Sequence, residues 1–313
     1  MVSSNKFNTV LLTGGSGMVG KNILAHPKCS EWNIISPSSK EVDLTHYEST
    51  LDFVKKSKPD IIIHAAGKVG GINANLSHPV DFLVTNLDLG RNIILAARQA
   101  GVKKMINLGS SCMYPRNSPN PLSEELILQG ELEPTNEGYA LAKIVAARLC
   151  SYINSEDSKF EYKTMIPCNL YGPYDKFETA QSHLIPAIIH KISHAIKNQV
   201  NEIEIWGDGN ARREFMYADD AADAIFYALS HFKEMPFLLN IGVGMDYSVN
   251  EFYSTTAEIM NYEGKFIHNL EKPVGMKQKL VSIEKQILWG WKPKTSLIQG
   301  IQSTYNYYLK QEQ

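Results

Sequence analysis

The feature that most constrains this fold is a glycine-rich turn near the start of the chain. Gly14, Gly17 and Gly20 follow the apolar run Val10–Thr13 and open a helical pattern over Met18–Ala25. In such a strand–turn–helix unit, the first glycine permits the tight turn, the second lets backbone approach a pyrophosphate, and the third lets helix and strand pack closely. Free N–H groups at the helix start favour a bound diphosphate. The turn therefore predicts a dinucleotide-binding fold.

Strands and helices alternate through the first half of the chain. The predicted strands occupy residues 33–35, 60–66, 104–109 and 162–167, and the helices between them occupy residues 47–56, 79–100 and 139–153. The run at 60–66 is almost continuously apolar, as expected for a parallel strand covered on both faces. This order predicts an α/β fold with a Rossmann-like, doubly wound parallel sheet.

The pattern changes after about residue 170. A helix at 182–196 and a short strand at 202–206 are followed by a polar loop, and a helix at 219–229 and a strand at 238–241 are expected to return to the first sheet. We therefore expect two domains. Residues 1–168 with about 214–243 would form the NADP-binding Rossmann domain, and about 169–213 with 244–313 a smaller, mixed α/β domain that binds the substrate, a nucleotide sugar by the resemblance described below.

Composition excludes several classes of function. The chain has 31 basic and 33 acidic residues and a net charge of −2, which argues against nucleic acid as a partner. Cys29, Cys112, Cys150 and Cys168 show neither a CxxC pair nor zinc-like spacing, so we expect no metal and no disulfide framework. No apolar run reaches about 18 residues, and no signal-peptide pattern starts the sequence. We expect a cytoplasmic enzyme without membrane contact.

The residues after the second predicted strand indicate which dinucleotide binds. NAD sites place a carboxylate there, roughly 20 positions beyond the turn, to bond the ribose 2′-hydroxyl. This chain has hydroxyls and a lysine instead, at Ser38, Ser39 and Lys40. These groups suit a 2′-phosphate, so NADPH is the expected cofactor, although Glu41 and Asp43 lie close by. We expect Asp43 near the adenine.

A tyrosine and a lysine four residues apart predict the catalytic end. Tyr139 and Lys143 would lie on one face of a helix. A neighbouring ammonium is expected to lower the pKa of the tyrosine, which could then exchange a proton near neutral pH. Ser110 follows the strand at 104–109 and is placed to bond a substrate carbonyl. If the extended geometry continues, Cys112 faces the same site and Ser111 points away.

The same helix carries information about assembly. Residues 139–150 read YALAKIVAARLC and are apolar almost all round, so more than one side should be buried. One side should cover the sheet. The other could meet a partner subunit or lie under the second domain.

Several longer segments carry a family resemblance. They read HAAGKVGGINAN (64–75), LGSSCMYP (108–115), LEPTNEGYALAK (132–143), PCNLYGPYDKF (167–177), SHLIPAIIHK (182–191) and WGDGNARREFMYADD (206–220). Together they resemble the GDP-L-fucose synthase family of extended short-chain dehydrogenases/reductases. The resemblance runs from about residue 10 to beyond residue 300. The SSCMYP segment followed by SHLIPAIIHK is the specific part.

The resemblance implies a two-stage reaction on GDP-4-keto-6-deoxy-D-mannose that yields GDP-L-fucose. Cys112 and His183 would be the acid–base pair that inverts C3 and C5, and its division of labour stays open. NADPH would then reduce C4, with Tyr139 supplying the proton. Ser110 would hold the C4 oxygen, and Lys143 would tune Tyr139 and orient the cofactor.

The resemblance also implies binding residues and an assembly. The expected cofactor-binding residues are Gly14, Gly15, Ser16, Gly17, Met18, Val19, Gly20, Ser38, Ser39, Lys40, Asp43, Ala65, Ala66, Asn86, Leu108, Tyr139, Lys143, Pro167, Asn169 and Leu170. The expected GDP-sugar-binding residues are Lys68, Val69, Asn169, His183, Lys191, Trp206, Arg213 and Lys279, with Arg212 able to replace Arg213. A homodimer would form through the helices at about 80–100 and 139–154. Some members carry a basic residue in the first glycine turn, where this chain has Gly15 and Ser16.

Two alternatives remain at this stage. The chain could reduce C4 of another GDP-4-keto sugar, such as a GDP-6-deoxy-4-keto-heptose, with or without epimerisation. It could instead be a non-catalytic NADP-binding sensor, although such proteins often lose the tyrosine or the lysine, and both are present here.

Overall fold

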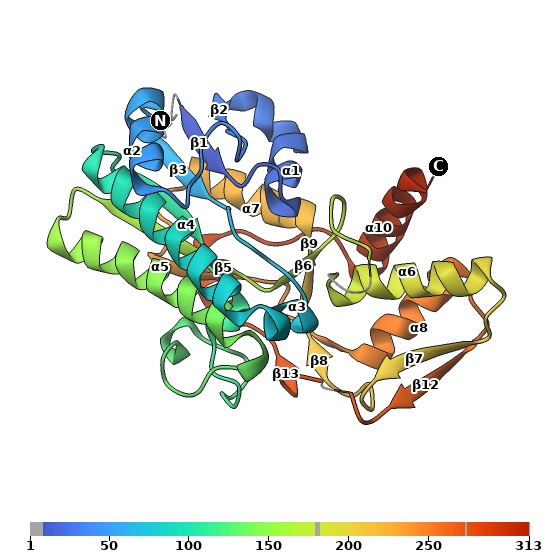
Figure 1. Cartoon of the computed structure of the whole chain (residues 1–313). Coiled ribbons are helices and arrows are strands. Elements are labelled where there is room, and N and C mark those ends of the chain that lie inside the picture. The colour runs from blue at the N-terminus through green and yellow to red at the C-terminus, as the bar shows by residue number, and fades with distance from the viewer. Residues whose placement is uncertain (1–8, 179–181, 273, 313) are drawn as a thin grey trace.

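A six-stranded parallel sheet organises the chain in the computed structural model, which describes residues 9–178, 182–272 and 274–312 (Figure 1). The strands are β1 (Val10–Thr13), β2 (Ile34–Ile35), β3 (Ile61–His64), β4 (Lys104–Leu108), β5 (Glu161–Pro167) and β10 (Leu238–Ile241). Their order is β10-β5-β4-β3-β1-β2, and every neighbouring pair is parallel. The order reverses between β1 and β3, so a crevice for ligands is expected at the carboxyl ends of these strands.

Helices cover both faces of the sheet. They are α1 (Met18–Ala25), α2 (Tyr47–Ser57), α4 (Pro79–Gln99), α5 (Glu137–Glu156) and α7 (Ala218–Ser230). Val10 and Leu12 pack into one apolar cluster with α7, whereas Leu11, between them, packs into a second cluster with α2 and α4. Successive side chains of a strand point to opposite faces, so a run of apolar residues fills both clusters. The predicted fold class is confirmed.

A smaller body follows in the second half of the chain. Helices α6 (Leu184–Lys197), α8 (Val249–Met260) and α10 (Leu297–Gln311) surround a third apolar cluster. The parallel pair β7 (Glu202–Trp206) and β12 (Lys265–Asn269) lies beside it (Figure 1). Capping boxes fix two of the helix starts, Ser248 with Glu251 at α8 and Ser296 with Gln299 at α10.

Short elements complete the fold, and several of them lie between the main sheet and the smaller body. They are α3 (Ile72–Ser77), β6 (Asn169–Tyr171), β8 (Arg212–Arg213), β9 (Phe215–Tyr217), β11 (Tyr247–Ser248), β13 (Gln278–Lys279) and α9 (Glu284–Trp289), with the 3-10 turns η1 (Pro27–Glu31), η2 (Ser111–Met113), η3 (Glu124–Leu126) and η4 (Pro134–Asn136). β6 pairs with β9, and β8 lies between β11 and β13. None of these connecting elements has a sequence pattern long enough to predict it.

Helix α5 keeps an apolar surface that the described part of the chain does not cover. Leu141 is 38% exposed, Val145 44% and Tyr152 61%, while α5 packs on α4 and β5. The alternative in which the second domain covers this side is therefore wrong for these residues.

Within the three described ranges, no helix combines the length and the apolar character needed to cross a membrane.

Candidate functional site

The glycine turn has the geometry that its sequence predicts. Gly14 has φ of +75°, and a Cβ on it would lie 2.6 Å from the backbone of Ala66. A Cβ on Gly20 would lie 2.2 Å from the carbonyl oxygen of Gly14. Gly17 caps α1 without a side-chain hydrogen bond, so no side chain of the cap occupies the N–H groups of this helix start. These observations fit a diphosphate held by backbone at α1.

The loop after β2 is arranged around Glu41. The backbone N–H and the hydroxyl of Ser38 both donate to Glu41 Oε2 at 2.8 Å. The exposed hydroxyl of Ser38 would have to turn from Glu41 to meet a phosphate, while Ser39 and Lys40 are exposed. The carboxylate of Asp43 accepts from Thr45 at the start of α2. Sequence reasoning left out Ser36, whose hydroxyl lies 1.9 Å from the position a Cβ on Gly15 would take.

The other residues predicted to bind the cofactor lie beside the carboxyl ends of neighbouring strands. Ala65 and Ala66 follow β3, Leu108 ends β4, Pro167 ends β5, and Asn169 and Leu170 lie in β6. Asn86, on α4, makes two hydrogen bonds with the backbone of Lys68. Its Oδ1 accepts from the N–H of Lys68 at 2.8 Å, and its Nδ2 donates to the carbonyl of Lys68 at 3.0 Å. Asn86 therefore fixes the position of Lys68 in the loop that follows β3.

Lys143 is buried, and Tyr139, one helix turn before it, is half-buried. Lys143 Nζ donates to the carbonyl of Leu108 at 2.8 Å and lies 5.9 Å from the centre of the Tyr139 ring. Burial lowers the pKa of Lys143 to about 8. Burial raises the pKa of Tyr139, the negative charge of Cys112 raises it further, and a hydrogen bond with Ser110 opposes both. The expected lowering of the Tyr139 pKa by Lys143 is therefore wrong, since desolvation dominates and keeps Tyr139 protonated.

Ser110 and Cys112 face one site for a different reason from the predicted one. The extended backbone stops after β4, and residues 111–113 form η2. The Ser110 hydroxyl accepts from the N–H of Cys112 at 3.2 Å, as a cap of this turn, while Ser111 is buried. The cap keeps Cys112 next to Ser110, whereas the argument from strand alternation does not apply.

Polar and cationic groups surround the thiol of Cys112. Asn136 Nδ2 lies 3.2 Å from Cys112 Sγ, and Lys279 Nζ lies 3.6 Å from it. Burial lowers the pKa of Arg213, and the negative charges of Glu133 and Cys112 partly offset this effect. Sequence reasoning missed Asn136, although it lies only three positions before Tyr139 and ends η4. Three segments distant in sequence thus place hydrogen-bond donors or positive charge at one sulfur.

His183 caps α6 and is paired with a carboxylate. Its Nδ1 lies 3.3 Å from Asp175 Oδ2 and 3.4 Å from Oδ1. Burial lowers the pKa of His183, but the hydrogen bond and the negative charge of Asp175 outweigh this, so the pKa lies above its ordinary value. Asp175 follows the GPY segment and was not predicted as a site residue. The pair favours a protonated imidazole.

The residues predicted to bind GDP are spread over five elements, β6, α6, β7, β8 and β13. Lys191, on α6, donates to the carbonyl of Glu204 at 3.0 Å and to the hydroxyl of Tyr253 at 3.3 Å. Trp206 ends β7, and Lys272 Nζ lies 5.6 Å from its ring centre. Arg213 donates to the carbonyl of Val274 at 2.8 Å. Arg213 lies near Lys279 and Cys112, whereas Lys191 and Trp206 belong to the smaller body.

Lys68 and Val69 lie on the loop after β3. The ammonium of Lys68 pairs with Asp81 at 3.0 Å, and Val69 is 47% exposed. The Lys68 side chain thus pairs with α4 in this structure and does not join the cationic group of Arg213 and Lys279.

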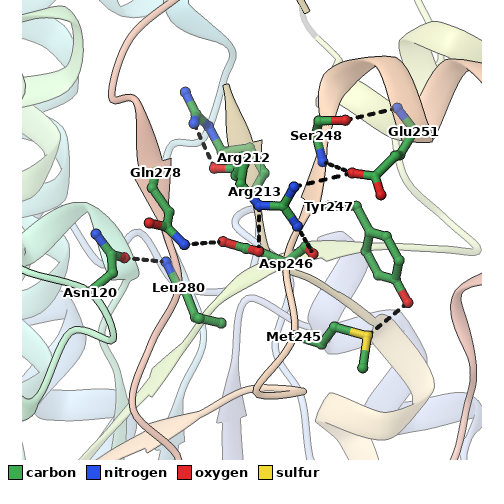
Figure 2. Close-up of polar contacts among 10 residues, drawn as sticks. All are labelled: Asn120, Arg212, Arg213, Met245, Asp246, Tyr247, Ser248, Glu251, Gln278 and Leu280. Carbon is green, nitrogen blue, oxygen red and sulfur yellow. Dashed lines mark hydrogen bonds and ion pairs between the residues drawn. The ribbon is translucent and has the colours of Figure 1, made fainter. Parts of the chain in front are cut away.

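Arg212 cannot replace Arg213. Figure 2 shows its guanidinium between Asp246 and Glu251, at 2.8 Å and 3.3 Å. Gln278 also donates to Asp246, at 2.6 Å. Successive residues of a strand point to opposite faces, so β8 directs Arg212 to this ion pair and Arg213 the other way (Figure 2).

A buried carboxylate that was not predicted joins the segments of the site. Glu214 Oε1 accepts from the N–H groups of Val243 and Gly244 at 2.6 and 2.7 Å, and Oε2 accepts from Val281 at 2.9 Å. Burial raises the pKa of Glu214 to about 7, against these hydrogen bonds. Its own N–H donates to the carbonyl of Lys279 at 3.1 Å. Glu214 therefore fixes Lys279 relative to the end of β10.

The structure offers no sign of a metal centre in the part of the chain that it describes. No group of three or more His, Cys, Asp or Glu side chains there could hold an ion. Cys150 and Cys168 are buried, and burial raises the pKa of both thiols.

Comparison with known proteins places this geometry in context. Residues 10–242 match the NAD dependent epimerase/dehydratase family. The chain is 54% identical over 303 residues to a GDP-L-colitose synthase of Yersinia pseudotuberculosis, covering 97% of this chain and 98% of the relative. It is 46% identical over 304 residues to a GDP-L-fucose synthase of Azorhizobium caulinodans, covering 97% of each.

A solved structure agrees over nearly the same length. It is a GDP-mannoheptose C4 reductase of Campylobacter jejuni with NADP bound, with a TM-score of 0.87 and 28% sequence identity, covering 96% of this chain and 98% of that one. Sequence and fold thus agree along the whole chain rather than at the dinucleotide turn alone.

Proposed function

Because the chain belongs to the NAD-dependent epimerase/dehydratase family, we propose that it is an NADPH-dependent epimerase–reductase of a GDP-4-keto-6-deoxy sugar. The observation that carries the proposal is the pairing of two proton-handling groups at one sheet edge. Tyr139, Lys143 and Ser110 form the first, and Cys112 begins the second, two residues from Ser110.

The first group serves reduction at C4. When bound, NADPH supplies the hydride that converts the C4 carbonyl to an alcohol. Ser110 holds the C4 oxygen, and Tyr139 donates the proton that this oxygen gains. Burial keeps Tyr139 protonated, which suits a donor. Lys143 is held by the carbonyl of Leu108 and supports both Tyr139 and the ribose of the cofactor.

The second group serves epimerisation next to the carbonyl. Removing a proton from carbon needs a base on one face of the sugar, and returning it to the other face needs an acid. Lys279 and Asn136 lie against Cys112 Sγ and stabilise negative charge there, which suits the base. Asp175 favours protonated His183, which suits the acid. The 4-keto group spreads the charge of the carbanion formed between these steps.

Binding of the GDP part rests on cations near the junction of the two bodies. Arg213 and Lys279 are the candidates that interact with Cys112, and Lys191, Trp206 and Asn169 are the others. The proposal keeps the division of the chain into an NADP-binding part, 1–168 with about 214–243, and a sugar-nucleotide part. It also keeps Ser38, Ser39 and Lys40 as the 2′-phosphate loop.

Two substrates deserve direct comparison. GDP-4-keto-6-deoxy-D-mannose would give GDP-L-fucose after inversion at C3 and C5. The relative that is 54% identical favours a second candidate, the 3-deoxy counterpart, which would give GDP-L-colitose. The 3-deoxy sugar has no stereocentre at C3, so only C5 would be inverted.

Product analysis in D2O tests the proposal. The protein is incubated with NADPH and each substrate, NADPH oxidation is followed, and the products are examined by NMR. We expect turnover of at least one substrate and deuterium at C5 of its product, with deuterium at C3 as well from the 3-hydroxy substrate. NADPH oxidation without deuterium would leave a C4 reductase alone, and no oxidation with either substrate would contradict the proposal.

Assembly is part of the proposal. Val80 and Val84 on α4 are 70% and 47% exposed, beside the exposed apolar residues of α5. An apolar surface on two adjacent helices fits a second copy of the chain. We expect a homodimer in light scattering, weakened by the substitution Val145→Glu.

A further inference from the structure

Five buried polar side-chain atoms lack hydrogen-bond partners among the described residues: Asn75 Oδ1, Asn107 Oδ1, Arg116 Nε, Asn136 Oδ1 and Ser182 Oγ. Three of them, on Asn75, Asn136 and Ser182, belong to segments that border the proposed sugar site. Asn136 touches Cys112, and Ser182 directly precedes His183. A buried polar atom without a partner costs about 1–3 kcal/mol, so a group of them near a reaction centre points to a ligand that supplies the missing bonds.

Helix α3 is the element that brings these atoms together. It packs against η4, which ends at Asn136. A Cβ on Gly71, the cap of α3, would lie 3.2 Å from the carbonyl oxygen of Ser182. Figure 1 places α3 at the junction between the helices of the main sheet and β8. The helix therefore borders both Cys112, through η4, and His183, through Ser182.

Asn75 is fixed within this helix in a way that leaves one atom available. Its side chain is only 7% exposed. Its Nδ2 donates to the carbonyls of Gly70 and Gly71 at 2.9 and 3.0 Å, which assigns the amide orientation. Its Oδ1 therefore remains a buried acceptor without a partner among the described residues.

The segment before α3 connects these atoms to the reductive group. A Cβ on Gly67 would lie 3.8 Å from Lys143 Nζ, and the next residue, Lys68, is held by Asn86. At the other end, a Cβ on Gly275 would lie 3.9 Å from Ile72 Cδ1 and 3.5 Å from the Arg213 guanidinium. The segment from Gly67 to Asn75 thus runs along the proposed sugar between Lys143 and Arg213.

We propose that Asn75 and Ser182 form a hydroxyl-binding subsite for the hexose ring, with Asn136 Oδ1 as a third acceptor beside it. The inference rests on the proposed function, because it assumes that a sugar lies between Cys112 and His183. Asn75 accepts a hydrogen bond from a ring hydroxyl, and Ser182 exchanges one with the same or the adjacent hydroxyl. The subsite binds a hydroxyl group that is itself neither oxidised nor reduced.

Ser182→Ala is the sharpest test, because the hydroxyl makes no hydrogen bond to the described residues. Its removal should leave Tm and the Kd for NADPH unchanged. We expect kcat/KM for the GDP-4-keto sugar to fall about three- to tenfold, the effect of one lost hydrogen bond. Ser77→Ala, at an exposed position of α3, is the matched control and should behave like wild type.

Asn75→Ala gives an independent measurement, with Tm recorded because the loop contacts of Nδ2 are also lost. Each variant is assayed with the 3-hydroxy and the 3-deoxy substrates. A loss with the 3-hydroxy sugar alone supports a subsite for O3, and an equal loss with both supports one for O2. If Ser182→Ala and folded Asn75→Ala both keep kcat/KM within about twofold for both substrates, the subsite is refuted. Wild-type inactivity would instead refute the proposed function.

Discussion

The predicted cofactor turn and the proposed sugar site of this protein are built in opposite ways. The turn is contiguous, and its contacts join Gly14, Gly17 and Gly20 to one another and to Ala66 at the end of β3. The sugar site draws Cys112, Asn136, His183 and Lys279 from four separate segments. The first region therefore has a geometry of its own, whereas the second exists only when distant parts of the chain have packed.

The polar groups beside the predicted cofactor, at the ends of β1, β3 and β4, are also more completely satisfied than those of the proposed sugar site. Lys143 is bonded to a carbonyl and His64 to Thr13, whereas Asn75, Asn136 and Ser182 each keep an unpartnered atom. A region whose polar groups are already hydrogen-bonded can bind a common cofactor with little rearrangement. A region with unpartnered polar atoms can select among sugars by the hydroxyls that supply the missing hydrogen bonds. Substitutions should therefore separate the two activities.

Tyr139→Phe should separate them most strongly. Loss of the general acid should lower NADPH oxidation by on the order of 10²–10⁴-fold. The acid–base pair on the substrate side stays intact, so exchange of the C5 proton with D2O should continue. The measurement is single-turnover NADPH absorbance together with NMR of the recovered sugar. If exchange disappears along with reduction, the two regions do not act separately.

Cys112→Ser is the complementary change. The weaker acidity of the hydroxyl should reduce C5 exchange by on the order of 10²-fold or more, while the Kd for NADPH stays at the wild-type value. Exchange is followed by NMR, and cofactor binding by fluorescence titration. Cys29→Ser, at a partly buried cysteine remote from the site, is the control. Unchanged exchange would assign the base to another residue.

Gly14→Ala tests the cofactor side alone. The new Cβ would be forced against the backbone of Ala66 at φ of +75°, so NADPH affinity should fall by about tenfold or more and Tm should drop, since the left-handed conformation alone costs about 1–2 kcal/mol. Gly101→Ala separates strain from packing, because Gly101 has φ of +78° with nothing within 4 Å of its Cβ position. Equal losses in both variants would mean that contact with Ala66 does not matter.

Asp175→Asn should give the smallest effect, on the substrate side. Asp175 raises the pKa of His183. His183 donates in its protonated form, so C5 exchange falls as pH rises through this pKa. Replacing the carboxylate lowers the pKa, and the alkaline limb of the exchange profile should move to lower pH. Asp52→Asn, at an exposed position of α2, should leave the profile in place. A limb that does not move would argue against His183 as the acid.

The sequence predicts the main sheet well because local periodicity determines it. The apolar run at 60–66 contains β3, and the glycine turn places the start of α1 at Met18. The short strands β6, β8, β9, β11 and β13 could not be predicted, since each has only two or three residues and forms by pairing with distant segments.

The site shows the same division. The spacing of Tyr139 and Lys143 is visible in the sequence because both lie on one helix turn. The direction of the Tyr139 pKa shift is not visible in the sequence, because burial by other segments decides it. Asn136, Asp175 and Glu214 were missed for a similar reason, since their partners lie 24, 8 and at least 29 positions away. The roles of the predicted binding residues remain predictions.

The carboxylate of Glu214 has a consequence for the order in which the protein becomes competent during synthesis. The chain emerges from its N-terminus, and domains begin to fold as they appear. The glycine turn and its contact at Ala66 need little more than the first fifth of the chain, so they can assemble early. Glu214 Oε2 gains its hydrogen bond only after Val281 has been synthesised, and Lys279 lies in the same late segment. The nascent protein can therefore form its predicted nucleotide-binding turn well before the residues of the proposed sugar site come together.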